Sequence, residues 1–304
     1  MIGIPLTVIA YALLLLSAIA FLYKTKRMAG LPPHLRWELA PVPHEKGKNQ
    51  YGGSYLEEFE WWTKPREKSL INEAVYMFKE IFFLKGVLDH NKKLWYFSFP
   101  FHFGLYLLGG MVFFLIINAL LGIGNFVQTG NFIYSLIDIF ALSGYLIGTI
   151  GTLGLLVSRT INFNLRNFNT GGTFLNLMLL FAFFISGAIA FLLQPEFSSE
   201  MTRFTGALFT ANIDLILSPL TTLHCILGLI FLAYLPFTRM IHFVAKYFTY
   251  HDVRWNDVPL PGNKRMEKKV QDLLGQTVTW AAPHVKADGK KNWVDIATKT
   301  EDES

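Results

Sequence analysis

The chain has 304 residues, of which 52% are hydrophobic and only 16% are charged. A soluble domain usually has about a quarter of its residues charged, so this composition excludes an ordinary soluble protein. The formal net charge is +5, and basic residues grouped beside apolar spans suit anionic lipid or a protein partner rather than nucleic acid. The single cysteine, Cys225, excludes an internal disulfide and an iron–sulfur or zinc site built by this chain alone.

Five apolar stretches reach or approach the roughly 20 residues that cross a bilayer as a helix. They are residues 4–22, 98–121, 132–157, 173–193 and 219–246. The chain is therefore predicted to be an all-α integral membrane protein with five transmembrane helices. The first stretch has no basic residue before it and no small-residue cleavage site after it, so we interpret it as a retained anchor.

The distribution of basic residues predicts the orientation. Lys24, Lys26 and Arg27 follow the first span, so the positive-inside rule puts the N-terminus outside and, after five spans, the C-terminus in the cytoplasm. The chain then divides into four segments. These are a transmembrane helix at 1–22, a cytoplasmic loop at 23–94, a four-helix membrane domain at 95–247 and a cytoplasmic partner-docking tail at 248–304.

The cytoplasmic loop has two parts. Residues 31–62 contain four prolines and the pair Gly52-Gly53, which disfavour regular helix, and several aromatic residues that suit packing on the membrane interface or on another subunit. Residues 66–89 alternate apolar and charged residues at helical spacing. This pattern predicts an amphipathic helix that lies at the membrane interface.

The second span carries His102 near its predicted inner end, in the sequence Phe-Pro-Phe-His-Phe-Gly that ends at Gly104. Gly104, Gly109 and Gly110 remove side chains where a flat macrocycle or a neighbouring helix needs room, and ordinary helix packing explains these glycines equally well. Met111 follows nine residues after His102. At about 100° per residue it lies on the opposite face of the helix.

The third span carries Asp138, about two turns below the predicted outer surface. A carboxylate at this depth suggests a proton acceptor at a quinol site, and a hydrated structural Asp is the alternative. Arg159 and Arg166 follow at the inner end. Either could pair with a haem propionate, and positive-inside anchoring explains both without a cofactor.

The fifth span carries His224 and His242, eighteen residues apart. On one continuous helix this spacing completes five turns and puts both imidazoles on one face, about 27 Å apart along the axis. Imidazole is a haem ligand, so the pair suggests two haems stacked across the membrane. His242 lies at about the depth of His102, and these two could hold one iron.

The tail from residue 259 to 304 is polar but contains Trp280 and Trp293. Aromatic residues supply much of the energy of protein interfaces, so they suggest docking to a cytoplasmic partner. A flexible tail with incidental tryptophans is the alternative.

Together these features resemble the gamma (cytochrome b) subunit of respiratory nitrate reductase. The resemblance rests on five spans with an outside N-terminus, a His near the inner end of the second span, and two His eighteen apart on the fifth. The 31–62 region, the 99–104 motif and the 280–284 tail look more like the cytochrome b subunits of transmembrane redox complexes of sulfate-reducing microbes, including those with heterodisulfide-reductase-like partners. The resemblance covers most of the chain.

The resemblance implies haem b, with His102 and His242 as axial ligands of an inner haem and His224 as a ligand of an outer one. The family pattern places a second His ten residues after the first, and here that position is Val112, which cannot ligate iron. Three alternatives follow for the outer haem. Met111 ligates it after a local helix distortion, His224 is its only protein ligand, or it is absent.

We therefore expect a subunit of a quinone-linked oxidoreductase in the cell inner membrane, which transfers electrons between the quinone pool and a cytoplasmic iron–sulfur subunit. The resemblance implies menaquinone, and it also allows a periplasmic multihaem cytochrome c as a partner. One alternative is a proton-coupled small-solute transporter whose intramembrane histidines relay protons, and another is a structural anchor whose inner basic face and tail recruit soluble partners. A transporter would be colourless, whereas a haem protein would be red.

Overall fold

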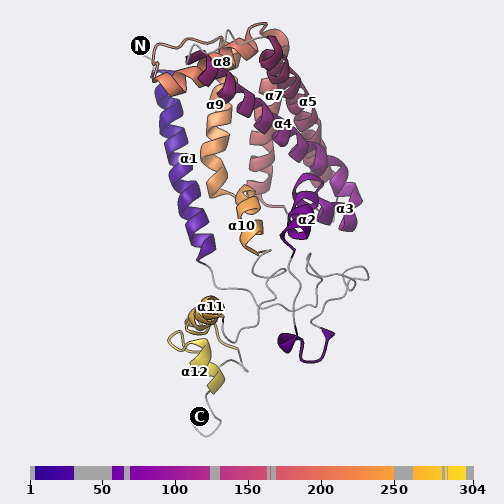
Figure 1. Ribbon diagram of the computed structural model, residues 1–304, viewed down its shortest axis with the longest axis vertical. Helices are drawn as coiled ribbons and strands as arrows, with labels where there is room; N and C mark the ends of the chain where they lie inside the picture. Colours follow the sequence, from indigo (N-terminus) through magenta and orange to yellow (C-terminus); the bar gives the residue numbers. More distant parts are fainter. Residues whose placement is uncertain are drawn as a thin grey trace. The chain divides into compact units, whose positions relative to one another are not determined.

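The structure is a computed structural model that describes residues 4–30, 57–64, 69–123, 131–162, 165, 169–249, 263–282, 285 and 287–298. Helices dominate these residues, and two isolated antiparallel bridges occur near the C-terminus. The chain divides into two units (Figure 1). The first unit comprises Met1–Phe21 and Met77–Arg239, and the second comprises Leu22–Tyr76 and Met240–Ser304.

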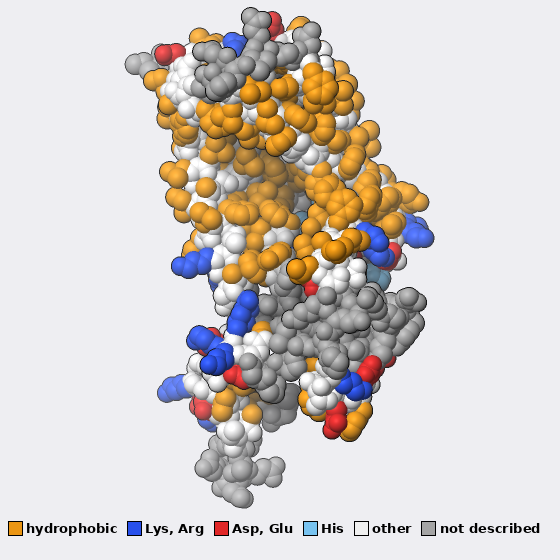
Figure 2. All heavy atoms as spheres, viewed as in Figure 1, with side chains coloured by type: hydrophobic (Ala, Val, Ile, Leu, Met, Phe, Trp, Pro, Cys, Tyr) orange, Lys and Arg blue, Asp and Glu red, His pale blue; other side chains and the backbone are white. Residues whose placement is uncertain are grey.

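Five helices are long and apolar enough to cross a membrane, which confirms the five predicted spans. They are α1 (Leu6–Ala29), α4 (Lys92–Ile123), α5 (Asn131–Ile161), α7 (Gly171–Leu193) and α9 (Pro219–Tyr234). Apolar side chains cover much of their outer surface (Figure 2). Large apolar side chains are exposed on all five of these helices, which indicates lipid rather than water as the surrounding solvent.

Helices α4 and α5 pack closely against each other. A Cβ added to Gly104 on α4 would lie 2.6 Å from the Cα of Gly148 on α5, and one added to Gly151 would lie 2.3 Å from the backbone nitrogen of Phe101. At these two crossing points only hydrogen fits between the backbones. A Cβ at Gly110 would meet the ring of Phe140, so Gly104 and Gly110 serve helix packing.

The fifth span is not the continuous helix predicted for 219–246. Helix α9 ends at Tyr234, and two 3₁₀ turns, η4 (Leu235–Phe237) and η5 (Arg239–Ile241), separate it from α10 (His242–Thr249). The cause is Pro236, which has no N–H to donate to the carbonyl of Leu232 and whose ring clashes with it. That carbonyl instead accepts a hydrogen bond from the hydroxyl of Ser17 on α1, at 2.8 Å. His224 and His242 therefore lie on separate helices, and the prediction of one continuous helix that carries both is wrong.

A helix that the sequence did not suggest, α8 (Phe197–Thr210), lies across the end of the bundle near the N-terminus (Figure 1). The segment carries Glu196, Glu200 and Arg203, which are typical of a polar connection between spans. Its buried residues Phe197, Met201 and Phe204 nevertheless recur at helical spacing. The hydroxyl of Tyr11 donates to the carbonyl of Leu208 at 2.5 Å, which attaches α1 to α8.

The predicted amphipathic helix at 66–89 is two helices, α2 (Leu70–Phe82) and α3 (Lys85–His90). They separate at Leu84, whose φ of 49° is left-handed and incompatible with a continuous helix. The indole N–H of Trp95 donates to the carbonyl of Phe83 at 2.7 Å. This bond satisfies a backbone group that the end of α2 leaves without a helical partner. That α2 lies at a membrane interface remains a prediction.

The C-terminal residues of the second unit are folded. Helix α11 (Lys264–Leu274) is followed by a bridge between Thr277 and Asn292 and by α12 (Trp293–Thr298). The rings of Trp280 and Trp293 contact each other edge to face, with centroids 6.1 Å apart. The described residues of the tail therefore include regular structure, and docking of the tail to a partner stays a prediction. The predicted packing role of residues 31–62 falls mostly on residues 31–56, which lie outside the described residues. Among the described residues that follow, Trp61–Thr63 form the 3₁₀ helix η3.

Candidate functional site

His102 is partly buried on α4, and its ring is held by the backbone of its own helix. Nδ1 lies 2.7 Å from the carbonyl oxygen of Ser98, four residues earlier. A carbonyl only accepts, so the ring proton is on Nδ1 and the lone pair is on Nε2. Histidines that ligate metals are typically oriented in this way, by a hydrogen bond from the other ring nitrogen.

His242 is the first residue of α10 and is exposed within the described residues. It belongs to the second unit, whereas His102 belongs to the first. The pairing of His102 with His242 therefore stays a prediction.

His224 on α9 is 2% exposed, and both of its ring nitrogens have hydrogen-bond partners on other helices. Nε2 lies 2.7 Å from the hydroxyl of Tyr145 on α5. Nδ1 lies 3.1 Å from the hydroxyl of Ser186 on α7, which in turn donates to the carbonyl of Phe183 at 2.9 Å. The hydrogen bonds of the two hydroxyl groups with the imidazole connect α5, α7 and α9 inside the bundle.

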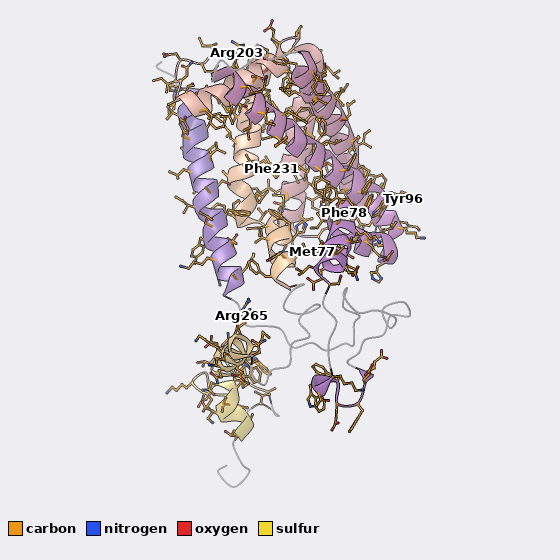
Figure 3. All side chains as sticks on the ribbon, viewed as in Figure 1. Met77, Phe78, Tyr96, Arg203, Phe231 and Arg265 are labelled. Atoms are coloured by element: carbon orange, nitrogen blue, oxygen red, sulfur yellow. The ribbon has the colours of Figure 1, made fainter. Side chains whose placement is uncertain are left out.

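Aromatic rings enclose the His224 imidazole. Phe183 stacks on it with centroids 5.1 Å apart, and Tyr145 meets it edge on at 5.0 Å. Phe197 of α8 lies 5.9 Å away, and Phe231 of α9, labelled in Figure 3, stacks in turn on Phe183. These rings surround the His224 imidazole with apolar groups that pack as closely as in a protein core.

Met111, the predicted alternative ligand, is 3% exposed and faces the same cluster. Its sulfur lies 3.8 Å from the Tyr145 hydroxyl. Val112, where the family pattern has a second His, points outward with 47% of its surface exposed. The structure thus brings Met111 and His224 to one tyrosine hydroxyl.

Asp138 on α5 is exposed and accepts a short hydrogen bond from the hydroxyl of Ser198 on α8. Near it, the amide of Asn118 donates to the hydroxyl of Thr202 at 3.2 Å, and that hydroxyl donates to the carbonyl of Ser198. These contacts suit either a proton acceptor or the hydrated structural Asp considered above.

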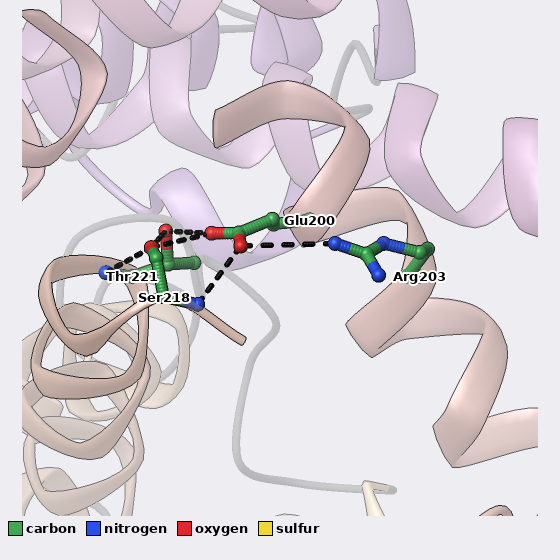
Figure 4. Close-up of polar contacts among 4 residues, drawn as sticks. All are labelled: Glu200, Arg203, Ser218 and Thr221. Carbon is green, nitrogen blue, oxygen red and sulfur yellow. Dashed lines mark hydrogen bonds and ion pairs between the residues drawn. The ribbon is translucent and has the colours of Figure 1, made fainter. Parts of the chain in front are cut away.

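Glu200, a buried carboxylate on α8, was not identified in the sequence. It accepts from the backbone N–H of Ser218 at 2.8 Å and the Ser218 hydroxyl at 2.7 Å, and from the hydroxyl of Thr221 (Figure 4). Arg203, on the outer side of α8, lies 3.7 Å away. The sequence feature that could have indicated the burial of Glu200 is its position between Phe197 and Phe204 on the apolar face of α8.

The environment of Glu200 affects its pKa in two directions. Burial raises the pKa, whereas the hydrogen bonds from Thr221 and Ser218 and the charge of Arg203 lower it, and the lowering is larger. The carboxylate therefore stays ionised and attaches α8 to the N-terminus of α9, where the helix dipole favours negative charge.

Arg159 at the end of α5 forms a reciprocal pair with Asn169. Its guanidinium donates to the side-chain oxygen of Asn169 at 2.8 Å, and the Asn169 amide donates to the Arg159 carbonyl at 2.9 Å. Nε of Arg159 is buried with no hydrogen-bond partner among the described residues. Arg166, the other predicted propionate partner, lies outside the described residues.

A hollow of about 530 Å³ opens beside the C-terminal half of α8. It is lined by Arg203, Gly206, Ala207, Thr210, Asn212, Asp214, Leu215 and Ile216. The predicted site residues are not among those that line it.

The family model described as nitrate reductase gamma subunit matches residues 86–257, which is more than half of the chain. No curated protein and no solved structure matches the chain significantly. The matched region contains α4, α5, α7, α8, α9 and all three predicted histidine ligands. The chain thus belongs to the nitrate reductase gamma subunit family, whose members are membrane haem b subunits of respiratory redox complexes.

Proposed function

We propose that this multi-pass membrane protein passes electrons between a quinone pool and a cytoplasmic iron–sulfur subunit, with His102 and His242 as the two axial ligands of one haem b. The observation that supports this most is the hydrogen bond from Nδ1–H of His102 to the Ser98 carbonyl. It gives His102 the tautomer and orientation of an axial ligand.

The residues near the end of α4 and α5 where His102 lies fit a haem. Gly154 of α5 packs on the ring of Phe97 of α4, so Arg159, which follows Gly154, lies towards the end of the bundle that carries His102. The buried, unpartnered Nε of Arg159 is a donor that a propionate carboxylate would satisfy. Haem supplies one-electron chemistry at its iron when it is bound. His102 and His242 would hold the iron, and Arg159 would hold a propionate.

The chain needs a partner for the next electron-transfer step. Its single cysteine cannot ligate an iron–sulfur cluster, which requires several thiolates. The described residues contain no group of three His, Cys, Asp or Glu that could hold a metal. An iron–sulfur subunit on the cytoplasmic side, near the folded tail, is the partner class that we propose. A periplasmic multihaem cytochrome c is an optional further partner.

We assign Asp138 as the proton acceptor of a menaquinol site. Its carboxylate is exposed and accepts a hydrogen bond from Ser198 through one oxygen, so it retains acceptor capacity. Glu200 is unsuited to this role because three donors from Ser218 and Thr221 already occupy its oxygens and keep its pKa low. The location of Asp138 also agrees with an N-terminus outside, which the basic end of α1 supports.

The experiment uses membranes that contain the full complex. The haem b content per chain and the extent of haem reduction by a menaquinol analogue are measured for His102→Ala, His242→Ala and a control, His90→Ala. His90 is exposed on α3 and is not a proposed ligand. Loss of haem from the first two variants and retention in the control are expected. Full haem content in both ligand variants would refute the proposal.

A further inference from the structure

We infer that His224 is a neutral, hydrogen-bonded core residue and not a haem ligand, so that this chain carries one haem b, at His102. The inference rests on the proposed function for the haem at His102. Its claim about His224 rests on the packing around that residue alone.

Every hydrogen-bonding capacity of a neutral His224 is used. The Ser186 hydroxyl donates to the Phe183 carbonyl, so its oxygen is left to accept from Nδ1–H of His224. The proton on Nδ1 puts the lone pair on Nε2, which accepts from the Tyr145 hydroxyl. An imidazole has one donor and one acceptor in this form, and both are satisfied inside the bundle.

The Tyr145 hydroxyl occupies the position that an iron atom would need. Iron bonds to imidazole along the lone pair of the ring nitrogen, and that direction on Nε2 is taken by an oxygen at 2.7 Å. The same hydroxyl contacts the sulfur of Met111. A haem held between His224 and Met111 would have to displace the Tyr145 side chain.

Displacing Tyr145 is costly because its ring is closely packed. A Cβ added to Gly187 of α7 would lie 2.3 Å from the Tyr145 ring, so the ring fills the space that the glycine leaves. Tyr145 and Phe184 are 0% exposed, and Phe197 is 1% exposed. A macrocycle much larger than a phenol ring has no room here unless α5 and α7 separate. The residues around His224 therefore do not fit a haem.

The cluster has a structural use instead. Tyr145, Ser186 and His224 connect three membrane-spanning helices by hydrogen bonds, and Met111 adds a contact from a fourth. Such hydrogen bonds stabilise the contacts between helices in a membrane. In this chain they hold together the part of the bundle where a second haem would separate the helices.

The test counts haem in membranes, where a weakly held haem is not lost during purification. Haem b per chain and the redox titration are measured for the wild type, His224→Gln, Tyr145→Phe and the matched control His102→Gln. Gln can still accept from Tyr145 and donate to Ser186, but it does not ligate haem. We expect one haem and one redox transition in the wild type, in His224→Gln and in Tyr145→Phe, and no haem in His102→Gln.

Two haems per wild-type chain, with one lost in His224→Gln, would overturn the inference. The wild-type count decides the question even if His224→Gln fails to fold. Tyr145→Phe should lower the melting temperature and leave the haem count unchanged, because it removes only the hydroxyl. A wild-type chain with no haem would agree with the claim about His224 and would instead overturn the proposed function.

Discussion

The hydroxyl of Ser17 on α1 lies 2.8 Å from the carbonyl oxygen of Leu232 on α9, the carbonyl that Pro236 leaves without a helical donor. An α1 residue thus satisfies the backbone group freed by the helix break. Because an unsatisfied carbonyl is costly where no water is available, this bond stabilises the break in the fifth span.

Ser17→Ala should destabilise the protein by about 1 kcal/mol, since it removes the donor of this hydrogen bond. In a Pro236→Ala background the new N–H of residue 236 can satisfy Leu232, and the cost of Ser17→Ala should fall towards zero. Thermal unfolding of the four proteins in detergent gives this double-mutant cycle. Equal costs in both backgrounds would show that the two residues do not share the carbonyl.

Glu200→Ala should destabilise the protein by about 2–4 kcal/mol, because it leaves three donors from Ser218 and Thr221 without their acceptor. The control is Glu196→Ala, at the exposed N-cap position just before α8, where the side chain makes no capping hydrogen bond, with an expected cost below about 0.5 kcal/mol. Both are measured by chemical or thermal unfolding. Similar costs for the two variants would contradict the role of Glu200 in attaching α8 to α9.

The lowered pKa of Glu200 predicts a pH dependence. Because the pKa is lower in the folded than in the unfolded state, the contribution to stability is complete above the ordinary value of 4.5. It is lost as the pH falls through the lower pKa of the folded state. Melting temperatures between pH 3 and pH 7 should therefore fall on the acid side for the wild type. Glu200→Gln should depend less on pH in this range, and identical profiles would contradict the assignment.

Asp138→Asn should abolish or strongly slow haem reduction by a menaquinol analogue while haem content stays at the wild-type level. The amide has nearly the same shape and can still bond to Ser198, but it cannot accept a proton. Ser198→Ala is the control for loss of the hydrogen bond alone, and it should keep most of the rate. Unchanged reduction in Asp138→Asn would mean that the carboxylate is structural.

Composition and apolar run length were enough to predict the membrane helices, because crossing a bilayer requires about 20 apolar residues whatever the neighbours are. Pro236 also indicates the break in the fifth span. The eighteen-residue spacing of His224 and His242, however, favours one continuous helix, and this was the prediction. Helix α8 is hard to predict because Glu196, Glu200 and Arg203 are typical of a connection between spans. Burial of Glu200 depends on donors from another helix, which no local pattern contains.

The candidate site was predictable only where one helix determines it. The contact of His102 with Ser98 follows from i to i−4 spacing, so a histidine suited to ligate iron could be inferred from the sequence. The partners of His224 come from α5 and α7, 79 and 38 residues away in the chain. A ligand and a buried core histidine have the same local sequence, and only tertiary packing distinguishes them.

The central claim is that one iron is bound by two imidazoles, from His102 and His242, and that the chain holds no other haem. Near-infrared magnetic circular dichroism of the oxidised complex, calibrated by haem b per chain, identifies axial ligands and counts sites together. The predicted result is one haem with bis-histidine ligation, absent from both His102→Ala and His242→Ala. A second haem, or a spectrum of histidine–methionine ligation, would contradict the account.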